Sequence, residues 1–167
     1  MIVVIDTNVP IVANGKSEQA SPSCVKACVI NLGKLMKNGK LVLDNQWHII
    51  KEYRNKLHSS GQPGVGDAFL EWVLRNRCNP KRCELVDITL DDSDTTNFKE
   101  FPSDKRMVDF HYRDRKFIAV SLSHPRNPVI WQAVDAKWWN FQNVLAENGV
   151  IVEFLCERDI KRILNIQ

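Results

Sequence analysis

The chain has 167 residues, with 23 Lys or Arg against 20 Asp or Glu and a formal net charge of +3. Hydrophobic residues make up 44% of the chain and charged residues 26%, proportions that exclude a disordered polypeptide. We expect a single domain over residues 1–167, because a chain of this length can bury a sufficient core. The small positive charge neither indicates nor excludes a nucleic-acid partner.

The apolar pattern predicts strands that alternate with helices. Residues 2–5 are β-branched and continuously apolar, which is typical of a strand covered on both faces in a parallel sheet. Further strands are predicted at 41–43, within 84–88, in 129–134 and in 150–155. Helices are predicted at 21–37, after Asp44 as far as 57, at 67–77, 113–122, 138–147 and 158–164. The alternation predicts an α/β fold with helices on both faces of a parallel sheet.

Residues 89–109 are expected to form a surface excursion with a helical turn, because they are polar and hold Pro102. No run reaches the ~18 to 20 apolar residues that a membrane helix needs, and Asp6 interrupts the apolar start. There is also no basic start followed by a long apolar segment, so we expect a cytoplasmic protein with no membrane partner.

Acidic residues follow three of the predicted strands. In an open α/β sheet the functional crevice lies beyond the carboxyl ends of the strands, where Asp6, Asp44 and Asp135 are expected. Asp44 and Asp135 also precede helices, where Asp is a favoured N-cap, and for Asp44 we favour that interpretation. No helix is predicted directly after Asp6, so this carboxylate has no cap to form and needs another partner to offset its desolvation.

Two further acids are predicted to reach the same crevice from helices. Asp114 shares a helical face with Phe117, Ile118 and Ser121, at i+3, i+4 and i+7. Glu52 borders the apolar stripe of the second predicted helix. The alternatives are that Asp114 only caps its helix and that Glu52 is an ordinary solvated residue.

Carboxylates that converge on one crevice repel each other, so either their pKa values rise or a cation neutralises them. A ligand set made of oxygen atoms favours Mg²⁺ or Mn²⁺, and such an ion suits the hydrolysis of phosphodiester bonds. Competing motifs are weak. The segment 61–66 lacks the Lys-Ser/Thr of a phosphate-binding loop, no GxGxxG follows the first strand, and no GxSxG is present.

The five cysteines are odd in number and include no CxxC pair, which argues against a disulfide framework and against a zinc ribbon. We expect reduced, partly buried thiols. The alternative is a metal site that joins Cys78 and Cys83 to histidines.

Four segments, in this order and across essentially the whole chain, resemble the PIN-domain nucleases. They are Asp6-Thr7-Asn8-Val9, Glu52-Tyr53, the run from Asp114 to Val120, and Val134-Asp135-Ala136-Lys137-Trp138. The resemblance implies a three-layer α/β/α domain, a sheet of order 3-2-1-4-5, and an acidic pocket that binds Mg²⁺ or Mn²⁺ and cleaves RNA. It also implies that Asp6, Glu52, Asp114 and Asp135 are the catalytic and metal-binding acids, with Asn8 in support.

The chain departs from that family at two positions. Lys137 stands where many members have a second Asp, and Ala133 stands where a hydroxyl residue is frequent. These changes motivate an alternative function, a catalytically weakened RNA-binding or scaffold protein. Many family members of this size are the toxin partners of small antitoxin proteins, although this chain is longer than many of them. A homodimer is also left open.

Our hypothesis is that Asp6, Asp114 and Asp135 hold the ion, while Glu52 completes the shell or accepts a proton from the attacking water. Single-stranded or structured RNA needs cationic contacts, and four basic residues beside the acids are candidates: Arg113, Arg115, Lys116 and Lys137. The basic residues at 75–82 fit RNA contact and a solvated helix end equally well. Trp138 and Trp139 offer a stacking surface, but core positions are favoured.

Overall fold

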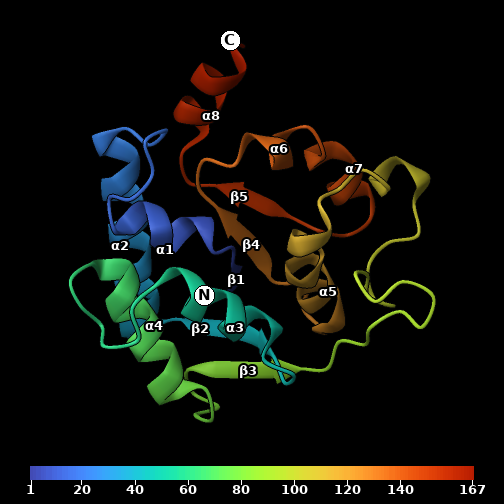
Figure 1. Cartoon of the computed structure of the whole chain (residues 1–167), viewed down its shortest axis with the longest axis horizontal. Helices are drawn as coiled ribbons and strands as arrows, with labels where there is room; N and C mark the ends of the chain where they lie inside the picture. Colours follow the sequence, from blue (N-terminus) through green and yellow to red (C-terminus); the bar gives the residue numbers. More distant parts are fainter.

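The computed structural model describes residues 1–167 and contains one five-stranded, all-parallel sheet (Figure 1). The strands run in the order β3-β2-β1-β4-β5. They are β1 (Ile2–Ile5), β2 (Lys40–Asp44), β3 (Cys83–Val86), β4 (Val129–Gln132) and β5 (Val152–Phe154). In the register of the central strand, Val3 lies opposite Leu41 on one side and Val129 on the other. The predicted α/β class and the strand order 3-2-1-4-5 are confirmed.

Eight α-helices flank this sheet (Figure 1). They are α1 (Asn8–Ala13), α2 (Pro22–Asn38), α3 (His48–Lys56), α4 (Val65–Asn76), α5 (Arg115–Ser123), α6 (Ala136–Trp139), α7 (Gln142–Glu147) and α8 (Glu157–Leu164). Helices α1, α2 and α4 pack against one another, whereas α5 packs against β1, β2 and β4 and also contacts α3. The three-layer α/β/α arrangement follows from helices on both sides of the sheet. None of the helices is both long enough and apolar enough to cross a membrane.

The core lies between the sheet and these helices because the strands are apolar on both faces. Val4 and Ile5 of β1 are fully buried, as are Val42 and Leu43 of β2. Trp138 is also buried, as expected of a core residue, and packs edge to face against Phe110.

The excursion between β3 and α5 contributes more to the core than its polar sequence suggests. Phe98, Phe101, Met107 and Phe110 are all buried in the main apolar cluster. The predicted helical turn is present as two 3-10 turns, at Lys105–Met107 and Tyr112–Asp114. These four side chains therefore attach the segment to the core.

The helices depart from prediction in two places. Helix α1 begins at Asn8, directly after Asp6 and Thr7, where no helix was expected. The helix predicted over 138–147 is divided into α6 and α7, with Asn140 and Phe141 between them. The segment 61–66 is a connection between α3 and α4 that leads into the first turn of α4, in agreement with the prediction.

The cysteines require a correction. Cys24 of α2 and Cys156, which precedes α8, form a disulfide, so the expectation of reduced thiols is wrong for these two residues. Cys28 and Cys83 are buried free thiols, and Cys78 is an exposed one. The two cysteines are 132 residues apart along the chain, so no short spacing motif in the sequence could indicate that they pair.

Candidate acidic site

Four separate elements carry the predicted acids. Asp6 follows β1, Asp135 is the N-cap residue of α6 after β4, Asp114 precedes α5, and Glu52 lies within α3. Strands β1 and β4 are neighbours in the sheet, so their carboxyl ends lie side by side. The charges of Asp114, Glu52 and Asp135 all raise the pKa of Asp6, which means that the fold brings the four carboxylates together.

Asp6 is the most buried of the four acids, with 4% of its surface exposed. Burial raises the pKa of Asp6 well above its ordinary value, and the charge of Asp114 raises it further. The backbone N–H of Asn8 donates to Asp6 Oδ1 at 2.8 Å, which acts in the opposite direction. The N-cap residue of α1 is Thr7 and no side chain caps this helix, so Asp6 forms no helix cap, as the sequence predicts. The bond from Asn8 is the partner that offsets part of the desolvation of Asp6.

Asp114 sits at the turn that begins α5. Burial and the charge of Asp135 raise the pKa of Asp114 to about 6, while Lys116 and His111 lower it. The Nδ1 atom of His111 lies 3.8 Å from Asp114 Oδ2. Asp135 accepts the backbone N–H of Lys137 at 3.0 Å and so caps α6, as its position before a helix predicts.

Asp44, by contrast, is a structural cap. Its carboxylate accepts the backbone N–H groups of His48 and Ile49, at 2.7 and 2.9 Å, and its side chain is fully buried. The N-cap residue itself is Trp47, so Asp44 lies three residues before the expected position, but its carboxylate has the capping role predicted for it. The residue stands at the end of β2 and fixes the start of α3, the helix that carries Glu52.

Glu52 is held from two sides, and its side chain is 25% exposed. Thr7 Oγ1 donates to Glu52 Oε1 at 2.6 Å. The ammonium group of Lys116 forms an ion pair with Glu52 Oε2 and also donates to the backbone oxygen of Arg113. Lys116 is 8% exposed, so the acidic pocket contains a buried cation that the sequence analysis had placed on the RNA-binding surface.

A cavity of about 760 Å³ opens above these groups. Its walls include Glu52, Asp114, Lys116 and Asp135. Basic side chains on α3 and on the segment before α5 also line it, and with Lys137 they form what we call the basic rim: His48, Lys51, Lys56, His111, Arg113 and Lys137. The sequence analysis named only two of these six, because the side chains come from three places in the chain and no local cluster marks them.

The remaining predicted residues divide into two groups. Asn8 links the two central strand ends, since its Oδ1 accepts the backbone N–H of Val134 at 2.8 Å. Arg115 is engaged elsewhere. Its guanidinium donates to the backbone oxygens of Val108 and Phe110 and does not line the cavity. The RNA contact predicted for Arg115 would have to form outside this cavity.

The basic residues at 75–82 also have local partners and lie outside the cavity. Arg75 pairs with Glu71, and Arg82 donates to the backbone oxygen of Lys37. Arg77 stacks over Trp47, with its Cζ atom 4.6 Å from the ring centre. These contacts fit a helix end that is tied to its neighbours.

The residues present fit a hard divalent cation. The four carboxylates share the pocket with a single ammonium group, that of Lys116. Burial is the main cause of the raised pKa values of Asp6 and Asp114, and repulsion between the carboxylates, which a cation relieves, raises them further. The only group of three ligand side chains with donor atoms within 4.8 Å of one another consists of cysteines, so the carboxylates are spread more widely. This spacing suits Mg²⁺, which keeps several of its waters and needs few direct protein ligands.

No protein-family model, curated protein or solved structure matches this chain. The role of the acidic pocket is therefore argued from its own residues and their geometry.

Proposed function

We propose that this protein is a divalent-metal-dependent endoribonuclease that hydrolyses RNA phosphodiester bonds in the acidic pocket. One observation carries the proposal. Carboxylates from four separate elements interact with one another beneath a basic rim, so sites for a hard cation and for a polyanion adjoin. The resemblance of the motifs to PIN-domain nucleases supports the same activity.

In this proposal Asp6, Asp114 and Asp135 would hold Mg²⁺ or Mn²⁺, directly or through water. A bound ion of this kind supplies positive charge that activates a water and offsets the charge developing on the phosphate. Glu52 accepts the proton of the attacking water as general base. Thr7 and Lys116 hold its carboxylate in one orientation.

Arg113 and Lys137 lie on the rim and are exposed, so their charges are available to RNA phosphates. Such contacts are independent of base sequence, because they reach the backbone of the RNA. They would hold the strand across the mouth of the cavity while Glu52 acts below.

Specific observations favour a second candidate, a weakened RNA-binding protein. Lys116 already neutralises part of the acidic charge, and Lys137 lines the cavity where the resemblance leads one to expect an acid. Ala133, at the position of a frequent hydroxyl residue, is fully buried. In this alternative the rim binds RNA and no cleavage follows.

The test is cleavage of a mixed-sequence RNA labelled with a fluorophore and a quencher, with Mn²⁺, Mg²⁺ or a chelator. We expect cleavage with either ion, none with the chelator, and a rate lowered roughly 100-fold or more in Glu52→Gln, because the general base is lost. Asp114→Asn is expected to lose activity because it removes a carboxylate ligand. The matched control is Asp109→Asn, an exposed acid five residues before Asp114, which should keep the wild-type rate.

Cleavage that persists in the chelator, or that is unchanged in Asp114→Asn, would contradict the proposed mechanism. RNA binding without cleavage in Mn²⁺ and Mg²⁺ would establish the second candidate instead.

A further inference from the structure

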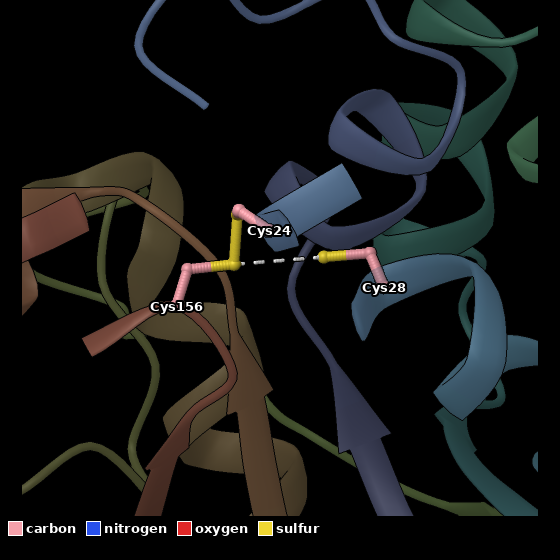
Figure 2. A group of neighbouring side chains, drawn as sticks. All are labelled: Cys24, Cys28 and Cys156. Carbon is pink, nitrogen blue, oxygen red and sulfur yellow. Dashed lines mark hydrogen bonds between the residues drawn. A yellow bond between two sulfur atoms is a disulfide. The ribbon is translucent and has the colours of Figure 1, made fainter. Parts of the chain in front are cut away.

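Three cysteine sulfurs meet between α2 and the residue that precedes α8 (Figure 2). Cys24 and Cys28 are one helical turn apart and share one face of α2, and Cys156 approaches them as the N-cap residue of α8. A cavity of about 510 Å³ lies beside Cys24 and Cys156. None of its lining residues lines the acidic pocket, so the cluster is separate from the proposed nuclease site.

The spacing of the sulfurs suits a shared metal ion. Cys28 Sγ lies 4.0 Å from Cys156 Sγ, and all three sulfurs lie within 4.8 Å of one another. Thiolates that bind one tetrahedral zinc ion at about 2.3 Å are separated from each other by about 3.8 Å. The Cys28 and Cys156 sulfurs already have nearly this separation. Cys24 becomes available as a third ligand once its disulfide with Cys156 is reduced.

The three cysteines of the cluster are shielded from solvent. Each cysteine is at most 5% exposed.

An exchange of disulfide partners is the competing role for Cys28. In that reaction a Cys28 thiolate would attack Cys156 and release Cys24. The Cys28 sulfur lies beside the Cys24–Cys156 bond and not on the line that extends it, because all three sulfurs lie within 4.8 Å of one another (Figure 2). The cluster is therefore better arranged for ligation than for exchange.

The cavity beside the cluster leaves room for a fourth ligand. The neighbouring cavity brings solvent to Cys24 and Cys156, and the exposed hydroxyl of Ser23 lines it. The two acids that line this cavity are already engaged, Asp159 by Ser21 and Arg162 and Glu157 by Lys161. Three thiolates with water in the fourth position form a complete tetrahedral set.

We propose that reduction of the Cys24–Cys156 disulfide converts this cluster into a three-thiolate site for one Zn²⁺, with water as the fourth ligand. With a water-soluble phosphine as reductant, the phosphine takes the oxygen of one water and becomes the phosphine oxide. The two hydrogens of that water then complete the two thiols. Binding of Zn²⁺ releases three thiol protons to solvent and forms three Zn–S bonds. The disulfide and the zinc ion are thus alternative links between α2 and α8.

The test uses Co²⁺ as a spectroscopic substitute for Zn²⁺ on the full chain reduced by the phosphine without oxygen. We expect a sulfur-to-cobalt absorption band in the near ultraviolet that saturates at one equivalent and disappears when Zn²⁺ is added. The oxidised protein should show no band. Carboxylate ligands give no such band, so the result is independent of any ion in the acidic pocket.

Two variants complete the design. Cys28→Ser should weaken Co²⁺ binding roughly 10-fold or more, since it removes one ligand, whereas the exposed Cys78→Ser should bind as the wild type does. In the reduced wild type, Zn²⁺ should also protect Cys24, Cys28 and Cys156 from alkylation, as measured by mass spectrometry. Absence of the band or of protection in the reduced wild type overturns the proposal, even if Cys28→Ser fails to fold. A folded Cys28→Ser that binds as the wild type does overturns the three-thiolate set.

Discussion

The ionisation of Asp114 couples the acidic pocket to the stability of the fold. The pKa of Asp114 is about 6, above its ordinary value, so the folded chain holds this proton more tightly than the unfolded chain does. Between about pH 4 and pH 6 the folded state binds more protons, and the free energy of unfolding therefore falls as the pH rises. The acidic pocket thus lowers the stability of the metal-free protein at neutral pH.

Asp114→Asn should remove this pH dependence, because the amide does not titrate. In metal-free buffer we expect the variant to gain up to about 3 kcal/mol relative to the wild type at pH 7, and to lose most of that advantage at pH 4. Denaturant unfolding at both pH values measures the effect. Asp109→Asn serves as the control and should follow the wild type. A stability difference for Asp114→Asn that is the same at pH 4 and pH 7 would contradict the coupling.

The residues that sequence reasoning could identify are those whose positions follow from a strand end or a helix start. Asp6 and Asp135 come after strands, and Asp114 opens a helix, so their approach to one edge of the sheet follows from the parallel topology. Lys116 was predicted to contact RNA at the surface, but its side chain turns inward to pair with Glu52. The direction of a long side chain depends on its partners, which the sequence does not reveal. The Cys24–Cys156 contact joins elements that only the finished fold brings together.

Helix α3 depends on a cap supplied by the preceding strand. Asp44 accepts two backbone N–H groups of the first turn of α3, and no other side chain caps this end of the helix.

Asp44→Ala should lower the free energy of unfolding by roughly 2 kcal/mol, because two buried donors lose their acceptor. It should also reduce cleavage, since α3 carries Glu52. Thermal unfolding and the RNA assay measure the two effects. Glu18→Ala, at an exposed acid between α1 and α2, is the control. An unchanged melting temperature in Asp44→Ala would show that the cap is dispensable.

The elements that could be predicted are long helices, in which apolar residues recur at helical spacing, and strands, in which apolar residues are continuous. All five strands and the helix from Pro22 were expected close to their observed bounds. Helix α1 is six residues long and contains Pro10, so it has no periodic signal of its own. The packing of the excursion between β3 and α5 was also missed, because its buried phenylalanines are scattered among polar residues.

Charge is distributed unevenly over the whole molecule, although the net charge is only +3. Lys51 and Lys56 belong to the basic rim and are exposed, so their charges are available to RNA phosphates.

The double variant Lys51→Gln/Lys56→Gln should bind RNA more weakly because two phosphate contacts are lost. The slope of log affinity against log salt should also shrink by about 1.4 for a single strand. Fluorescence anisotropy with chelator present measures both quantities. Lys34→Gln, an exposed lysine on α2 that lines neither cavity, should bind as the wild type does. An unchanged salt slope in the double variant would place the RNA elsewhere.

The link between Cys24 and Cys156 spans 132 residues, so most of the polypeptide lies within a single covalent ring. A protease that nicks an exposed part of the excursion, such as the stretch at 91–96, would therefore open the ring without releasing a fragment. The two pieces would migrate together under denaturing conditions and separate only after a reductant is added. The oxidised chain can therefore stay in one piece after its backbone has been cut.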